Sequence, residues 1–162
     1  MFTKSKREGV GIITHPILLG TTETMVNFLI KQRPRPQQRH RNNGRFHYDP
    51  SSQDKKDFIL QAKEYAPKNP SKNGLDAKFT FCYKRPSTHY KTKDKKPVLK
   101  ENIPYYKTGK PDIDNLCKFY MDAMSGVFYK DDAQVTSINA VKVYGQEDYV
   151  HIKLAYNKNY CK

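Results

Sequence analysis

The sequence predicts a single small α+β domain in which two helices pack on a mixed, mostly antiparallel sheet. A chain of 162 residues has room for one hydrophobic core. Segments with apolar residues at helical spacing alternate with segments that have the patterns of strands. Hydrophobic residues make up only 36% of the chain, so the core is small and stabilisation by a second subunit is favoured. Residues 1–23 are expected to form an N-terminal arm, and residues 24–162 the domain.

The first half of the domain is expected to hold two strands and a helix. Residues 24–31 are mostly apolar and predict a largely buried strand, and residues 45–49 predict a short second strand. A helix is expected to begin near Ser51, because apolar residues then recur at helical spacing until Pro67 ends the run.

The second half is expected to add three strands and the second helix. Residues 75–85 alternate strictly between apolar and polar side chains, which predicts a strand with one buried face. Residues 112–125 carry an apolar stripe typical of a helix, and Gly126 is expected to cap its C-terminal end. Two strands, at 135–144 and 148–156, are separated by a short turn and predict an antiparallel hairpin.

The charge of the chain points to nucleic acid as its partner, with an anionic membrane as the lesser alternative. The formal net charge is +14, and two segments, 31–45 and 84–110, hold half of the 30 Lys and Arg residues. Both segments are interrupted by prolines, so we expect loops that follow phosphates. For the longer segment, a disordered insertion kept soluble by lysines is the alternative. The side chains expected to contact DNA are Lys31, Arg33, Arg35, Arg39, Arg41, Arg45, Lys91, Lys93, Lys95, Lys96 and Lys110.

Cysteine usage and hydropathy exclude several other classes. The chain has three cysteines, Cys82, Cys117 and Cys161, and no CxxC pair, so neither a zinc site nor a disulfide framework is supported. Residues 9–20 are too short an apolar segment to span a bilayer and lack a cleavage site typical of signal peptides. We therefore expect no membrane partner and an intracellular, DNA-associated protein of cellular or phage origin.

Five aspartates lie between residues 112 and 132, in a chain that is otherwise short of acids. Asp112 and Asp114 start the second helix, and Lys118 follows Asp114 one turn later on the same face. Asp131 and Asp132 lie in the loop after this helix, which a tight reversal would bring back beside the helix start. A carboxylate beside a phosphodiester is unfavourable unless a cation lies between them. The set therefore predicts a site for Mg²⁺ or Mn²⁺.

A structural interpretation of the same residues stays open at this point. Asp112 would then only cap the helix, Asp114 and Lys118 would form an ordinary ion pair, and Asp131 and Asp132 would be turn residues. The spacing alone does not separate this interpretation from a metal site, because acid pairs are common at helix starts.

Three motifs then occur in order along this part of the chain. Residues 110–118 read KPDIDNLCK, residues 121–124 read MDAM, and residues 126–135 read GVFYKDDAQV. Together they resemble the RusA-type Holliday junction resolvases, and the resemblance extends from about residue 25 to the C-terminus. Two departures are visible: the region before these motifs is longer, and Pro111 stands where the family often has arginine, so Lys110 is expected to supply that charge.

The resemblance implies a RusA-like fold and a Mg²⁺-dependent homodimer, in which Mn²⁺ can substitute, that cuts four-way DNA junctions by paired nicks. It implies metal-binding catalytic roles for Asp112, Asp114 and Asp132, an essential cationic role for Lys118, and supporting roles for Asn115 and Asp131. Our hypothesis is therefore a structure-selective endodeoxyribonuclease of DNA recombination and repair. The alternatives are a non-enzymatic nucleic-acid-binding or architectural protein, and a related metal nuclease that acts on flaps or forks.

Overall fold

The computed structural model describes residues 24–42, 44 and 47–157. The predicted N-terminal arm, Arg45 and Cys161 lie outside these residues. Within the described part of the chain, no helix is long and apolar enough to cross a bilayer.

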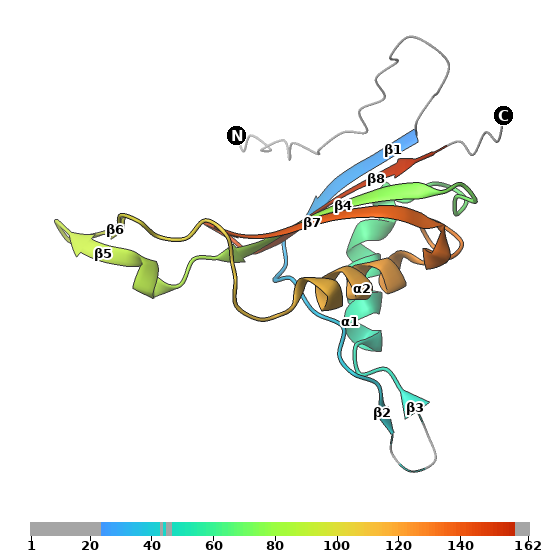
Figure 1. Cartoon of the computed structure of the whole chain (residues 1–162), viewed down its shortest axis with the longest axis horizontal. Coiled ribbons are helices and arrows are strands. Elements are labelled where there is room, and N and C mark those ends of the chain that lie inside the picture. The colour runs from blue at the N-terminus through green and yellow to red at the C-terminus, as the bar shows by residue number, and fades with distance from the viewer. Residues whose placement is uncertain (1–23, 43, 45–46, 158–162) are drawn as a thin grey trace, which may run out of the picture.

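A four-stranded mixed sheet forms the central layer, with the strand order β1-β8-β4-β7. Its strands are β1 (Thr24–Ile30), β4 (Leu75–Lys84), β7 (Val135–Gly145) and β8 (Tyr149–Tyr156). Two helices, α1 (Ser52–Ala62) and α2 (Ile113–Met124), lie on one face of this sheet (Figure 1). The predicted α+β class with two helices on a mixed sheet is confirmed.

The core lies between the sheet and the helices. The side chains of β4 alternate between its two faces, as its sequence predicts, and its aliphatic and aromatic side chains face the helices. The side chains that β4 buries on the helix side are Leu75, Ala77, Phe79, Phe81 and Tyr83. Phe81 packs against Tyr120 of α2, with 5.5 Å between ring centroids, and Phe58 of α1 meets the same tyrosine edge-on at 5.0 Å. These contacts fix the apolar stripe of α2 against β4 and leave its polar side chains facing outward.

The predicted hairpin between the last two strands is wrong. β4 lies between β7 and β8, pairing parallel with β7 and antiparallel with β8. The chain leaves β7 at Gly145, crosses the end of β4 and returns as β8. A Cβ atom at Gly145 would collide with the sulfur of Cys82, so glycine permits this close crossing. The carboxylate of Asp148 accepts the backbone N–H of Lys84 at 2.9 Å and closes the end of β4.

The second basic segment contains regular structure where only a loop was expected. β5 (Tyr90–Lys93) and β6 (Lys96–Leu99) form an antiparallel ribbon that extends away from the sheet, after a short 3₁₀ turn η2 (Ser87–His89) (Figure 1). Asp94 and Lys95 join the two strands with φ values of 51° and 61°. Two consecutive left-handed residues make the type I′ turn that matches the twist of a two-residue hairpin.

The first basic segment is mostly irregular, as predicted, but it lies along α2. The backbone N–H of Arg35 donates to the hydroxyl of Tyr120 at 3.1 Å, and that of Gln37 donates to the carbonyl of Asn115 at 2.9 Å. A short hairpin of β2 (Arg41–Asn42) and β3 (His47–Tyr48) follows. Two further 3₁₀ turns are η1 (Lys63–Tyr65), which continues α1, and η3 (Asp132–Gln134), which precedes β7.

Candidate active site and nucleic-acid interface

The start of α2 presents two exposed carboxylates. Asp112 is the N-cap residue and Asp114 lies in the first helical turn. The side chain of Asp112 accepts no hydrogen bond from the helix it precedes, so its carboxylate is not used for capping. The interpretation of Asp112 as a capping residue alone is therefore not supported. The C-cap residue of α2 is Ser125, whose backbone is extended at ψ 134°, so the helix ends one residue before the predicted cap Gly126, whose φ is 80°.

Asp114 and Lys118 lie one turn apart, both exposed, on α2. None of the ion pairs among the described residues includes either of them. The interpretation of this pair as a simple i,i+4 salt bridge is therefore also unsupported. The start of α2 thus offers two carboxylates and an ammonium group whose charges are available to a ligand.

Asp131 performs a different task at the far end of α2. Its carboxylate accepts the backbone N–H of Ala133 at 2.8 Å, and the side chain of Gln134 accepts the backbone N–H of Asp131 at 2.9 Å. This reciprocal capping box orders η3. Gln134 also donates to the carbonyls of Ser71 and Asn73, which ties the turn to the chain entering β4. The exposed Asp132 is the first residue of the turn that Asp131 orders.

Asp132 lies at the opposite end of α2 from the other two acids, so the predicted return of its loop to the helix start is wrong for a single chain. A helix of 12 residues is about 18 Å long. Asp132 precedes β7, whereas the residue of β7 that reaches the helix start is Lys142, which donates to the carbonyl of Pro111 at 2.7 Å. Figure 1 shows the chain turning into β7 beside the last turn of α2.

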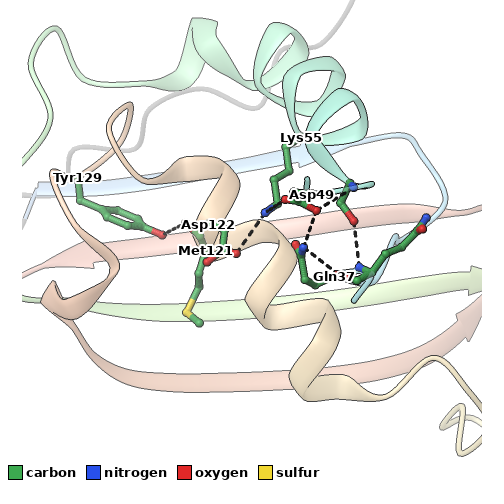
Figure 2. Close-up of polar contacts among 8 residues, drawn as sticks. Gln37, Asp49, Lys55, Met121, Asp122 and Tyr129 are labelled. Atoms are coloured by element: carbon green, nitrogen blue, oxygen red, sulfur yellow. Dashed lines mark hydrogen bonds and ion pairs between the residues drawn. The ribbon is translucent and has the colours of Figure 1, made fainter. Parts of the chain in front are cut away.

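The loop after α2 closes locally, which is the physical reason for this separation. The hydroxyl of Tyr129 donates to the carbonyl of Met121 at 2.8 Å (Figure 2), and the backbone N–H of Gly126 donates to the carbonyl of Tyr129 at 2.7 Å. Accordingly, the described residues hold no group of three or more potential metal-ligating side chains.

The acids at the start of α2 nevertheless fit the donor chemistry of a hard divalent cation. Mg²⁺ prefers oxygen ligands and is commonly held by one or two carboxylates together with substrate phosphates and water. Asp112 and Asp114 supply two carboxylates that neither cap α2 nor form an ion pair among the described residues. The start of α2 therefore brings together two of the three predicted ligands, Asp112 and Asp114, and leaves Asp132 apart from them.

Sequence reasoning missed a second polar cluster, which joins the first basic segment to both helices. Lys55 of α1 pairs with Asp49 at 2.8 Å and with Asp122 of α2 at 3.2 Å (Figure 2). Gln37 donates to the same carboxylate of Asp49 at 2.8 Å. The lysine side chain is only 16% exposed. No local signal predicts this cluster, because Asp122 lies 67 residues from Lys55 in the sequence and only the packing of the two helices brings them together.

The protonation of Asp49 reflects these contacts. Burial by itself would raise the pKa of this carboxyl group, but hydrogen bonds from Lys55, from the backbone of Ser51 and from Gln37 together hold the pKa below its ordinary value. Asp49 is therefore a charged structural group. Asp122, which lies on the same α2 face as Asp114, is committed to Lys55 and not to the acids at the helix start.

Most of the predicted DNA-contacting cations are exposed and lie on the two basic segments. Lys31 and Arg35 pair with Glu147 and Asp54, respectively. Arg33 lies 5.7 Å from the ring centroid of Tyr83. The other described members of the set, all exposed, are Arg39, Arg41, Lys91, Lys93, Lys95, Lys96 and Lys110.

Comparison of the sequence with known proteins identifies a family that matches most of the chain. The family model described as "Endodeoxyribonuclease RusA" matches residues 28–155, which include both helices and the acids at either end of α2. The uncharacterized protein YqaN of Bacillus subtilis (strain 168) is 40% identical to this chain over 47 residues. That match covers 29% of this chain and 33% of the relative, so it spans about a third of the relative's length.

Proposed function

The chain belongs to the RusA family of endodeoxyribonucleases, and from this we propose that it resolves Holliday junctions by paired cuts during DNA recombination and repair. The observation that carries the proposal is the pair of uncommitted carboxylates, Asp112 and Asp114, exposed at a helix start in a chain of net charge +14. A strongly basic protein attracts DNA, and exposed acids at its surface oppose that attraction unless a cation bridges them to the phosphate.

We further propose Mg²⁺ as that cation, with Mn²⁺ as a substitute, held by Asp112 and Asp114. When bound, such an ion activates water and neutralises charge on the attacked phosphate. The chain's own part is to orient the two carboxylates at the start of a rigid helix. Lys118, one turn further along, would hold its ammonium group against the phosphate oxygens and stabilise the charge that develops there. Asn115 would support the site through its backbone, since its carbonyl fixes the first basic segment at Gln37.

The active form is proposed to be a homodimer in which two chains complete each site. In its own chain, Asp132 follows the far end of α2, a helix about 18 Å long. A two-fold axis would allow Asp132 of the partner subunit to approach the helix start, and the reverse contact would complete the second site. Two such sites related by symmetry suit a four-way junction, which carries two equivalent strands to cut.

Two basic projections are proposed to hold the DNA. The β5–β6 ribbon and the β2–β3 hairpin both leave the body of the protein, and α2 lies between them in Figure 1. In the ribbon, the pairs Lys91–Val98 and Lys93–Lys96 share one face, because residues directly opposite each other in an antiparallel pair do so. Three lysines therefore line one face of the ribbon, where they would follow a phosphate backbone.

The function is tested by Asp114→Asn in full-length protein. We expect binding to a four-way junction in the absence of metal to persist, while Mg²⁺-dependent nicking is lost by a factor of 100 or more, a typical order of loss when a group acts directly on the reacting phosphate. Asp57→Asn on the exposed surface of α1 is the matched control and should nick normally. Nicking by Asp114→Asn at the wild-type rate would remove this residue from the site.

Cleavage of different DNA substrates by the wild-type protein distinguishes between the remaining candidate functions. Preferred cleavage of junctions over flaps, forks and linear duplex supports resolution of Holliday junctions, and preferred cleavage of flaps or forks indicates the related nuclease. Binding without cleavage of any of these DNAs, with either Mg²⁺ or Mn²⁺, would indicate an architectural protein and contradict the proposal.

A further inference from the structure

We infer that Lys107 and Lys142 are positioning residues: they fix the strap of residues 109–111 and so hold Asp112 in place for the metal. The inference rests on the proposed function, because it assigns these lysines to the site at the start of α2. Neither lysine belongs to the motifs or to the set of predicted DNA contacts.

Two ammonium groups bind the carbonyl oxygens of three consecutive residues. Lys142 donates to the carbonyl of Gly109 at 2.9 Å and to that of Pro111 at 2.7 Å. Lys107 donates to the same carbonyl of Gly109 at 3.1 Å and to the carbonyl of Lys110. Every carbonyl of the strap is thus held by a lysine, and the next residue in the chain is Asp112.

The lysines themselves come from a rigid part of the fold. Lys142 lies in β7, and the backbone N–H of Lys107 donates to the backbone carbonyl of Lys142 at 3.0 Å, so the two residues are fixed side by side. Lys107 also lies 5.0 Å from the ring centroid of the buried Tyr83. The strap is therefore attached to the edge of the sheet and not only to the helix that follows it.

This arrangement brings like charges together, which is unfavourable unless something offsets the repulsion. Burial, and then the neighbouring charges of Lys142 and Arg33, lower the pKa of Lys107. Neither Lys107 nor Lys142 forms an ion pair with a carboxylate among the described residues. The carbonyl oxygens are the acceptors that the structure gives these cations, and the geometry of the strap is what the lysines stabilise.

A positioning role and a purely electrostatic role predict opposite changes in metal affinity when a lysine is removed. A cation near Asp112 repels a divalent metal, so a purely electrostatic role predicts tighter metal binding after its removal. A positioning role predicts weaker binding, since partners that orient a ligand typically contribute a factor of about 10 to 100 in metal affinity. The direction of the change decides between them.

The experiment measures Mn²⁺ binding to the full-length protein by the electron paramagnetic resonance signal of the unbound ion. We expect Lys142→Met and Lys107→Met each to weaken Mn²⁺ binding by about 10-fold or more. Lys142→Arg should recover part of the loss, because a guanidinium can also donate to two carbonyl oxygens. Lys78→Met removes an exposed lysine of β4 that makes none of these contacts, and it should bind Mn²⁺ as the wild type does.

Thermal unfolding shows which variants are folded. Either lysine variant tests the inference by itself, so one folded variant is sufficient. Unchanged or tighter Mn²⁺ binding by the lysine variants, with normal binding by wild type, would overturn this inference and leave the proposed function standing. Wild-type protein that binds no Mn²⁺ and nicks no DNA would instead contradict the proposed metal site, and the inference would fall with it.

Discussion

Asp112 and Asp131 both occupy the N-cap of a helical segment, yet only Asp131 uses its carboxylate there. The sequence motifs present both residues as part of one acidic set, and their spacing cannot separate a capping acid from an uncommitted one. A carboxylate acts as a cap only where a backbone N–H lies within hydrogen-bond distance of it. Residue types at the candidate site were therefore predictable, whereas the task of each carboxylate required the hydrogen-bond geometry.

Lys55 is the cation that holds Asp49 and Asp122 together between α1 and α2. Its ammonium group lies between Asp49 and Asp122, so Lys55→Met would leave two partly buried carboxylates facing each other without a cation. We expect the free energy of unfolding at neutral pH, measured by urea titration, to fall by about 1–3 kcal/mol, less than for a fully buried pair. Lys56→Met, on the exposed side of α1, is the control and should change it by less than about 0.5 kcal/mol.

The pH dependence of the same variant identifies the cause. The folded pKa of Asp49 lies below its unfolded value of about 3.9, so its contribution to stability is present above that pH and is lost as the pH falls through the folded pKa. Wild type should therefore lose stability on acidification more steeply than Lys55→Met, and their unfolding free energies should converge. A difference that is constant from neutral to acidic pH would indicate lost packing in place of lost charge pairing.

Among the elements of the core, periodicity predicted which segments are helices and strands but not which strands are neighbours. The alternation of β4 and the apolar stripe of α2 were sufficient to identify both elements. The placement of β4 between β7 and β8 was not predictable, since a short connection normally joins adjacent strands. Gly145, whose missing Cβ permits the crossing, is the residue that could have signalled it.

The β5–β6 ribbon shows the opposite limitation. Its residues are almost all exposed, so no alternation of apolar and polar side chains marks its strands, and Pro97 argues against a strand. The turn at Asp94 and Lys95 lacks the glycine that usually announces a type I′ turn. A pattern that depends on burial cannot detect an element that buries almost nothing.

The lysines on one face of this ribbon are expected to contribute to DNA binding. Replacing Lys91, Lys93 and Lys96 together by glutamine removes the cations of one face, so binding to junction DNA should weaken for all sequences. The slope of log affinity against log salt concentration should decrease by about 3, one counterion for each phosphate contact. Fluorescence anisotropy of labelled junctions, with metal omitted, measures both quantities.

The control for the ribbon removes the same charge from another surface. Its substitutions, all at exposed positions on or after α1, are Lys56→Gln, Lys63→Gln and Lys68→Gln. A general effect of net charge would reduce the salt slope equally in both triple variants. The ribbon would then not be a DNA contact.

At the scale of the whole molecule, one chain places the predicted ligands at two ends of α2, and the proposed dimer brings the ends of different chains together. The proposed dimer would explain three features together: the low proportion of hydrophobic residues, the exposed acids and the match to the symmetry of a four-way junction. It also has a consequence that no single-chain site shares: two inactive variants with substitutions at opposite ends of α2 should complement each other.

Mixing Asp114→Asn with Asp132→Asn tests that consequence. In a heterodimer of these chains, one site carries both substitutions and the other carries neither, so nicking activity should return to about a quarter of the wild-type level after random exchange of subunits. The heterodimer holds a single intact site, so it should nick one strand of a junction without making the paired cut. If each site were built within one chain, both sites of the heterodimer would be damaged, and the mixture would stay as inactive as its components.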